Sequence, residues 1–346
     1  MQGGVEMHCE NLYTHMHSCY KLRVYRRKPY LTEVSAHKFE NIEYVDLPST
    51  RIKGLEAVIH TFLSAIHIIF HRPDAVHIHN IGPGMFAPLI RLFRIPIILT
   101  YHSPNYEHSK WGAVSKAILR LSEKISLSCA KKIIFVNSFQ REKLGRKVLA
   151  KSVYIPNGIN KIKMGRSTEL LRSLGIDSRE YILSVGRLTP EKGFEYLVEA
   201  VNKLEEVKHL VIVGGSDHDT GYLKLLKQLD VNEKVIFTGY TQGEDLRQLY
   251  SHARLYVLSS VNEGFPLVLL EAMGYQLPLV VTDIPATHLI ELPEDNYVEV
   301  ANSEALALGI RKTLAKGFKL HNYDLDNYNW DTIARQTLEL YKQVLK

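Results

Sequence analysis

Short apolar runs rich in β-branched residues alternate with longer amphipathic stretches along the whole chain. This alternation predicts parallel sheets joined by crossover helices. In the first half the runs that predict strands are residues 22–25, 42–47, 75–79, 97–101, 132–136 and 152–155, with helical patterns such as 55–70 and 114–128 between them.

A second alternating set follows a polar, glycine-containing stretch, residues 157–174, which is typical of a linker. Its predicted strands are 181–185, 209–213, 235–238, 255–258, 279–282 and 297–300, and its predicted helices are 194–204, 222–229, 245–251, 266–274, 303–314 and 330–346. The fold class we predict is α/β, with two Rossmann-like, doubly wound domains, 1–160 and 161–328, and a C-terminal helical segment, 329–346. Such domains bind ligands at the carboxyl ends of their strands, so we expect the two to face each other across a cleft.

The beginning of the sequence departs from this plan. Gly3 and Gly4 lead directly into a helical pattern, residues 6–17. A Gly-Gly loop before a helix normally follows the first strand of such a domain, and that strand is missing from the sequence. The first strand is central in a doubly wound sheet, so we expect either a gap in the sheet, a start upstream of Met1, or a compensating arrangement.

Length and charge agree with this plan and limit the partners. The 346 residues are enough for two ordinary domains, and the net charge of +6 suits anionic partners such as sugar nucleotides or an acidic membrane surface. The basic residues are scattered and no nucleic-acid motif accompanies them, so we expect no nucleic-acid partner.

The cysteines and the most apolar window indicate a cytoplasmic protein. Cys9, Cys19 and Cys129 are odd in number and far apart, which offers no disulfide framework and no metal spacing. No signal peptide is visible. Charged and histidine residues interrupt residues 55–70, which fall short of the roughly 20 apolar residues that a membrane span requires. We therefore expect a cytoplasmic location, with peripheral contact to the cytoplasmic membrane face left open.

The segment from Glu263 to Glu271 is the most informative one for chemistry. A predicted strand opens here into a loop, and Pro266 fits the first turn of the following helix. Backbone amides of residues 264–267 would point out of the helix start, where the helix dipole favours an anion such as a pyrophosphate. Glu263 and Glu271 could accept hydrogen bonds from hydroxyls at opposite ends of one ligand. The alternative is a pair of solvated surface glutamates, but the apolar residues between them indicate a buried helix, in which an unpaired carboxylate is costly.

A second constellation, residues 184–193, lies where another predicted strand ends. Gly186 and Arg187 form the turn, and Lys192 precedes the next helix. The Arg187 guanidinium can bind phosphate oxygens in a forked geometry, and Lys192 supplies a compact charge. Two cations beside a diphosphate would stabilise the charge that develops as a sugar leaves, which would make a metal unnecessary. Either cation alone could equally be an ordinary surface residue.

The Gly-Arg-Leu-x-x-Glu-Lys-Gly motif followed by Glu-x7-Glu resembles the retaining family 4 of glycosyltransferases, also described as glycosyl transferases group 1. The resemblance covers most of the chain. Further matching elements are Pro156-Asn157-Gly158-Ile159-Asn160, similar to the family's domain linker, Phe237-Thr238-Gly239-Tyr240, similar to its nucleobase-side strand end, Trp330 in its closing helix and Gly3-Gly4 in its N-terminal glycine loop.

The resemblance implies a GT-B fold and a role for each matching position. Arg187 and Lys192 would hold the donor diphosphate, Glu263 the donor sugar, and Glu271 the ribose. His102 matches the family's histidine near the reacting sugar, although a plain loop histidine is the alternative. The remaining donor-side positions are Gly186, Gly264, Phe265, Pro266, Leu267 and Tyr240. Gly3 and Gly4 would form an acceptor or phosphate loop, and the last helix would pack back toward the first domain.

Some positions depart from the family or invite a metal. Residues 284–288, Ile-Pro-Ala-Thr-His, replace the family's glycine-containing turn, which leaves the local loop shape open. Residues 217–219 and 324–326 are Asp-x-Asp sequences, but solvated loop carboxylates are the better interpretation. His77 and His79 share one face of a strand, where packing is the better interpretation. We therefore predict no metal and no cofactor.

The function predicted on these grounds is transfer of a sugar from a nucleotide-diphosphate donor, of UDP or GDP type, to a hydroxyl of a sugar or lipid-linked acceptor, with retention. Polysaccharide or glycolipid biosynthesis is a family-level expectation. The alternatives are a nucleotide-sugar epimerase or hydrolase on the same fold, and a non-catalytic donor-binding subunit. A glycosidase that uses the two glutamates as its acid–base pair gives no reason for the two cations, and we set it aside.

Overall fold

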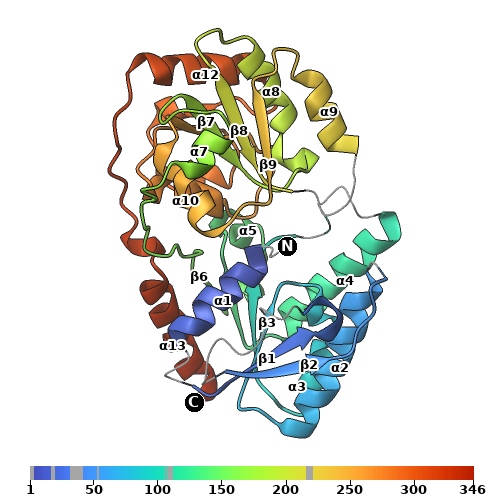
Figure 1. Cartoon of the computed structure of the whole chain (residues 1–346). Helices are drawn as coiled ribbons and strands as arrows, with labels where there is room; N and C mark the ends of the chain where they lie inside the picture. Colours follow the sequence, from blue (N-terminus) through green and yellow to red (C-terminus); the bar gives the residue numbers. More distant parts are fainter. Residues whose placement is uncertain are drawn as a thin grey trace. The chain divides into compact units, whose positions relative to one another are not determined.

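The computed structural model describes residues 4–16, 20–31, 42–52, 54–104, 106, 112–215 and 221–346. The chain divides into two compact units (Figure 1). We call Gln2–Gly158 together with Asn327–Lys346 the N-terminal unit, and Ile159–Asp326 the C-terminal unit.

The C-terminal unit contains a parallel sheet of six strands in its described part, in the order β12-β11-β10-β7-β8-β9. The strands are β7 (Tyr181–Val185), β8 (His209–Val213), β9 (Val235–Gly239), β10 (Leu255–Leu258), β11 (Leu279–Thr282) and β12 (Tyr297–Val298). Strands β8 and β9 follow on one side of β7, and strands β11 and β12 follow on the opposite side of its neighbour β10. Loops after these two neighbouring strands diverge to opposite faces, and ligands bind at such a switch point.

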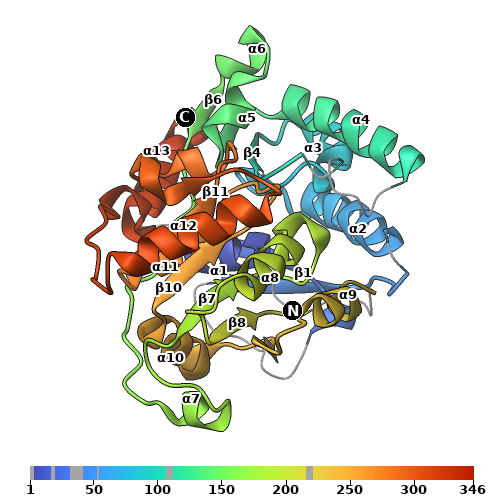
Figure 2. The ribbon, with the colours of Figure 1, turned by 90° about the horizontal axis from the view of Figure 1, so that it is seen from above.

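Helices cover both faces of this sheet, so its strands are apolar on both sides. They are α7 (Glu169–Ser173), α8 (Phe194–Asn202), α9 (Gly221–Leu229), α10 (Gly243–His252), α11 (Leu267–Gly274) and α12 (Ser303–Ala315), with the 3-10 turns η5 (Pro190–Lys192), η6 (Thr287–Leu289) and η7 (Glu294–Asn296). Helix α8 lies between α9 and α12 (Figure 2) and buries Phe194, Leu197 and Val198 against the sheet. Each such side chain contributes about 1.5–3 kcal/mol when fully buried.

The N-terminal unit is also parallel α/β, but its described strands form two sheets. Strand β1 (Leu22–Arg27) pairs with β2 (Ile42–Leu47), whereas β3 (Val76–His79), β4 (Ile97–Tyr101), β5 (Lys132–Phe135) and β6 (Ser152–Tyr154) form a second sheet in that order. In the described part of this unit β1 and β3 do not pair, and helix α1 (Gly4–Met16) is its first element. Among the arrangements expected from the sequence, a gap between the described strands β1 and β3 is therefore the one observed.

Helices cover both faces of the four-stranded sheet (Figure 1). Helices α2 (Leu55–His71), α3 (Ala87–Leu92) and α4 (Ala113–Cys129) pack on one face, and α1 and α13 (Trp330–Leu345) on the other. The remaining short elements are η1 (Lys28–Tyr30), η3 (Pro83–Phe86), α5 (Ser138–Glu142), α6 (Arg146–Leu149) and η8 (Asp326–Tyr328). Trp330 is buried so closely against Gly158 that a Cβ there would lie 2.6 Å from the indole.

The predicted α/β fold class is confirmed, and the longer strands and helices lie where the apolar pattern placed them. Two details differ. The predicted linker 157–174 ends in helix α7, because Leu171 is buried in the C-terminal unit. The short helices α3, α5 and α6 were not predicted, since a single turn shows no helical period.

Candidate functional site

The strand ends of the C-terminal unit bring the sequence-predicted groups to one edge of its sheet. Gly186 follows β7, Gly214 follows β8 and Tyr240 follows β9, and backbone bonds connect these loops. The Gly186 amide donates to the Val213 carbonyl at 2.9 Å, and the Gly214 amide donates to the Gly239 carbonyl at 2.9 Å. Segments distant in sequence therefore share one rigid edge.

Two glycines allow the loops to pack backbone against backbone. Gly214 has φ +149°, and a Cβ on it would lie 1.8 Å from the Gly186 carbonyl oxygen. Gly193 has φ +59°, and a Cβ there would lie 2.3 Å from the Ser259 carbonyl oxygen. Side chains at these positions would push the β7, β8 and β10 loops apart.

Lys192 and Glu263, which the sequence places in separate motifs, form one ion pair through Lys192 Nζ and Glu263 Oε1. Their side chains are 17% and 12% exposed, so water screens the pair only partly. Ser260 Oγ also donates to Glu263 Oε1 at 2.8 Å, and Ser259 Oγ donates to the Lys192 carbonyl at 2.9 Å. The strand β10 end thereby holds both members of the pair.

The start of helix α11 differs from the prediction. The helix begins at Leu267, and Pro266 is its N-cap with ψ 81°, not a residue of its first turn. As a result the Leu267 amide donates to the Phe265 carbonyl at 3.0 Å. The expectation that amides of residues 264–267 all point outward is therefore wrong at Leu267. Phe265 itself is buried, and Gly264 precedes it in the loop.

Glu271 lies on helix α11 and accepts a hydrogen bond at 2.8 Å from the Tyr250 hydroxyl on α10. Burial raises the pKa of the Glu271 carboxyl above its ordinary value, and the Tyr250 hydrogen bond opposes that rise. The Tyr250 ring stacks on Tyr275 with centroids 4.9 Å apart. Glu271 is thus a held, part-buried carboxylate, not a solvated surface residue.

The other predicted donor-side residues lie at the same edge. Arg187 directly follows Gly186 and is exposed. Tyr240 is half exposed, and its hydroxyl donates to Gln242 Oε1 at 3.2 Å. Residues 284–288, which follow β11, lead into η6. Thr287 Oγ1 donates a hydrogen bond to the Thr282 carbonyl at 2.9 Å. A threonine hydroxyl therefore closes this turn.

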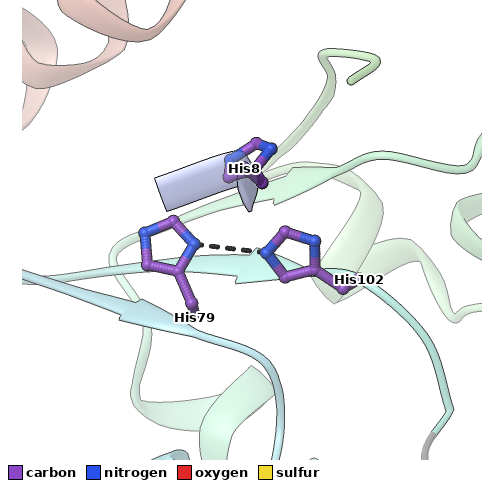
Figure 3. A group of neighbouring side chains, drawn as sticks. All are labelled: His8, His79 and His102. Atoms are coloured by element: carbon purple, nitrogen blue, oxygen red, sulfur yellow. Dashed lines mark hydrogen bonds between the residues drawn. The ribbon is translucent and has the colours of Figure 1, made fainter. Parts of the chain in front are cut away.

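His102 follows β4 in the N-terminal unit and is buried. Its Nε2 lies 3.2 Å from Nδ1 of His79, and its ring contacts the ring of His8 on helix α1 (Figure 3). Sequence reasoning missed His8, because one histidine in an amphipathic helix carries no signal. Gly4 begins α1, and Gly3 lies outside the described residues.

The structure describes only the second of the two Asp-x-Asp sequences. Residues 217–219 lie outside the described residues. Asp324 Oδ1 accepts the Asp326 amide at 3.0 Å, which is a local turn contact between exposed residues. Cys9 and Cys129 are free thiols, and Cys19 lies outside the described residues.

Family models match nearly the whole chain. One described as glycosyl transferases group 1 matches residues 167–330, and one described as Glycosyltransferase Family 4 matches residues 2–161. The uncharacterized glycosyltransferase MJ1607 of Methanocaldococcus jannaschii is 32% identical over 295 residues, which cover 78% of this chain and 75% of the relative. The chain belongs to the family 4 glycosyltransferases.

Other relatives of this family 4 glycosyltransferase agree. Alpha-maltose-1-phosphate synthase of Mycolicibacterium smegmatis is 26% identical, with 87% of each chain covered. Sucrose-phosphate synthase from Thermosynechococcus elongatus superposes with TM-score 0.82 at 23% identity, over 99% of this chain and 93% of that one. Anabaena Alr3699/HepE in complex with UDP-glucose superposes with TM-score 0.75 at 19% identity, over 99% and 95%. The predicted family and GT-B fold are confirmed.

A membrane-spanning helix is absent from the described residues. None of the helices there is both long and apolar enough to cross a bilayer. Helix α2, which contains the most apolar window of the sequence, instead buries Ser64, Ala65 and Ile68 in the N-terminal unit.

Proposed function

We propose that this glycosyltransferase moves a sugar from a nucleotide-diphosphate donor to an acceptor hydroxyl with retention at the anomeric carbon. The observation that carries the proposal is the Lys192–Glu263 pair, held at the switch point of the C-terminal sheet beside the Gly186-Arg187 turn. Ligands of doubly wound sheets bind at this place. The UDP-glucose complex of the HepE structure supports a donor of this class.

In the proposed reaction the side-chain cations of Arg187 and Lys192 act on the leaving diphosphate. The bond between the anomeric carbon and the diphosphate oxygen breaks, and a bond to the acceptor oxygen forms on the same face. The acceptor proton passes to the leaving phosphate. Arg187 and Lys192 stabilise the charge on that phosphate, so the transfer proceeds without a metal and without a cofactor.

The two glutamates hold hydroxyls of the donor. Glu263 is already paired with Lys192, so a donor placed here would meet a cation and a carboxylate at adjacent points, one for phosphate and one for sugar. Glu271 accepts from Tyr250 and offers its carboxylate to the ribose. Tyr240 lies on the nucleobase side, and Gly264, Phe265 and Pro266 complete the donor loop. UDP and GDP donors both fit this description.

The N-terminal unit would bind the acceptor, with His102 near the reacting sugar. Burial and the charges of neighbouring histidines lower the pKa of His102 well below its ordinary value, so its ring is neutral at neutral pH. A neutral imidazole carries one hydrogen-bond donor and one hydrogen-bond acceptor, and in this structure Nε2 of the ring faces His79.

The stereochemistry and the donor requirement test the proposal together. Purified protein is incubated with UDP- and GDP-sugars and candidate acceptors in the presence of a chelator, and the product is followed by NMR. We expect transfer only with an acceptor, with the anomeric configuration of the donor. Rapid conversion of the donor alone would indicate an epimerase or hydrolase, and an inverted product would overturn retention. Donor binding without turnover on any acceptor would indicate a non-catalytic subunit.

We also propose that the acceptor is lipid-linked and that the N-terminal unit contacts an anionic membrane surface, as in polysaccharide or glycolipid biosynthesis. Val114, Ile118 and Leu121 form an exposed apolar stripe on helix α4, 74%, 46% and 59% exposed. Exposed Arg120 and Lys124 lie on the same helix. An apolar stripe beside basic residues matches an anionic interface.

Vesicle sedimentation tests this contact. The protein should sediment with vesicles that contain phosphatidylglycerol and less with pure phosphatidylcholine. Changing Val114 and Leu121 to serine should reduce the bound fraction, whereas serine at exposed Val231 of the C-terminal unit should not. Equal sedimentation of both variants would contradict the contact.

A further inference from the structure

Three histidines of the N-terminal unit, of which His8 and His102 are buried and His79 is partly buried, lie around a common point. His8 lies on helix α1, and His79 and His102 lie at the ends of the adjacent strands β3 and β4 (Figure 3). One nitrogen from each ring lies within 4.8 Å of the other two. Among the residues that the structure describes, the group consists of imidazoles alone, without a carboxylate or a thiol.

The other contacts of each ring identify the nitrogens that face this point. His8 Nδ1 bonds Asn157 Oδ1 at 2.7 Å, and His8 Nε2 is buried without a hydrogen-bond partner among the described residues. His79 Nε2 bonds the Tyr13 hydroxyl at 2.6 Å, which leaves Nδ1 facing His102 Nε2 at 3.2 Å.

His77 is the neighbouring histidine that this pattern excludes. Its Nδ1 bonds the Tyr341 hydroxyl and its Nε2 bonds Thr100 Oγ1, both at 2.7 Å. Both nitrogens therefore have partners, as expected of a structural core histidine. His8 differs, because a buried polar atom without a partner costs about 1–3 kcal/mol unless a ligand or water satisfies it.

We propose that His8 Nε2, His79 Nδ1 and His102 Nε2 form a binding site for one first-row transition-metal ion of the Zn²⁺ class. Bonds of about 2.0–2.1 Å in a tetrahedron place ligand nitrogens roughly 3.3 Å apart, and His79 Nδ1 and His102 Nε2 already lie at 3.2 Å. The ligand atom of His8 lies within 4.8 Å of the other two, which makes it the third ligand.

The surroundings suit such an ion. Asn157 Oδ1 can accept from His8 Nδ1, and the Tyr13 oxygen can accept from His79 Nε2, which orients the remaining lone pairs in the way that outer contacts orient metal ligands. Burial lowers the pKa of all three rings, that of His8 to about 4, so neutral imidazoles face the ion at neutral pH. An all-imidazole set favours Zn²⁺, Cu²⁺ or Ni²⁺ over Mg²⁺.

This ion would inhibit transfer and would not serve as its cofactor, a consequence that rests on the proposed function. His102 is the residue proposed to lie near the reacting sugar, and its Nε2 would be occupied by the metal. Donor binding depends on the C-terminal unit and should be unchanged. Metal binding itself is measured without any substrate, so its failure and the failure of the proposed transfer are distinguishable.

The test is a titration of chelator-stripped, full-length protein with Co²⁺ and Zn²⁺. Tetrahedral Co²⁺ absorbs strongly in the visible range, and this signal requires no variant. The variants His8→Asn and His79→Asn are compared with His71→Asn, checked for folding by circular dichroism. His71 is the matched control, because it stacks on His67 one turn away on helix α2, where a surface histidine pair can bind metal adventitiously.

We expect one Zn²⁺ per chain, an intense Co²⁺ band that Zn²⁺ displaces, and both properties retained in His71→Asn. His8→Asn and His79→Asn should each weaken binding by at least about 100-fold. The proposal is overturned if the wild-type protein shows no tetrahedral Co²⁺ band. It is also overturned if His71→Asn removes the binding, or if both cluster variants bind as the wild type does.

Discussion

The two units share one α/β plan and differ in the two-stranded β1–β2 sheet, which the N-terminal unit has beside its four-stranded sheet. In the C-terminal unit, β7 and β10 are buried between helices on both faces. In the N-terminal unit β1 is only half-buried along its whole length, and its pairing with β2 is reinforced by cross-strand ion pairs in register. Arg23 pairs with Glu43 and Arg26 with Asp46, each opposite its partner in the ladder.

The difference extends to the chemistry that each unit can perform. The C-terminal unit presents charged groups, Lys192 and Glu263, on a rigid edge made of packed backbone. The N-terminal unit buries neutral imidazoles instead. Fixed charges suit the diphosphate of a donor substrate, whereas neutral imidazole nitrogens suit hydrogen bonds to hydroxyls or the binding of a metal ion. Close backbone packing at Gly193 and Gly214 positions the charged groups of the C-terminal unit, whereas hydrogen bonds between side chains position the imidazoles of the N-terminal unit.

Substitution of Gly214 should have the largest effect on stability. In Gly214→Ala the Cβ would meet the Gly186 carbonyl at 1.8 Å, so the edge must shift. We expect a loss of about 3 kcal/mol or more in urea unfolding, or failure to fold. Gly82→Ala is the control in the N-terminal unit, because a Cβ there meets nothing within 4 Å, and it should change stability by less than about 0.5 kcal/mol. Equal effects would contradict the packed-edge account.

Removal of the Glu263 charge should affect transfer next most strongly. Glu263→Gln keeps the shape and removes the charge that faces Lys192. We expect kcat/KM for transfer to fall by about 100-fold, equivalent to about 2.7 kcal/mol, with the fold retained. Glu43→Gln removes the corresponding charge of an exposed N-terminal pair and should leave kcat/KM within about twofold. A Glu263→Gln rate near that of wild type would remove Glu263 from the donor site.

Acidification should weaken the N-terminal unit selectively. Burial lowers the pKa of His8 to about 4 and of His77 to about 3. The stability that these neutral rings contribute is complete above about pH 6.5 and is lost as pH falls toward their folded pKa values, by up to about 1.4 kcal/mol per pH unit and ring. The effect of Glu271 on stability has the opposite sign. Because its pKa is raised in the folded state, acidification stabilises the folded C-terminal unit at this group.

Tryptophan fluorescence separates these two responses. Trp111 and Trp330 both fall within the residue ranges of the N-terminal unit, whereas far-ultraviolet circular dichroism reports both units. In urea at pH 7 and pH 5.5 the fluorescence transition should shift to lower urea by more than the circular dichroism transition. Identical shifts would show that the buried histidines do not distinguish the units.

The ion pairs should give the smallest effects and still distinguish the two units. Arg26 binds Asp46 through two nitrogens, at 2.7 and 2.9 Å, and lies over the Tyr44 ring at 4.2 Å. Arg26→Ala should therefore cost about 1 kcal/mol. Lys203→Ala in the C-terminal unit breaks an exposed pair and should cost about 0.3 kcal/mol. Equal values in urea unfolding would mean that the β1–β2 pair does not depend on its side chains.

Much of this organisation was predictable from the apolar pattern. Runs at 181–185 and 255–258 predicted two strands, which the structure shows to be neighbours, and the motifs that follow them contain Lys192 and Glu263. Their direct pairing was not predictable, because it depends on the contact between the Gly193 and Ser259 backbones, which only the folded chain reveals. His8 was missed for a similar reason. Its partner Asn157 is 149 positions away, beyond the reach of any periodicity.

The central claim is that the edge of the C-terminal sheet binds a nucleotide-sugar donor and stabilises its leaving diphosphate. The most direct measurement is the transfer rate of Arg187→Ala and Lys192→Ala beside the matched control Lys203→Ala, with folding monitored by circular dichroism. The account predicts that the first two each lose transfer, with rates at least about 100-fold lower, while the control and all three folds stay unchanged. Wild-type-like transfer by either Arg187→Ala or Lys192→Ala would contradict it.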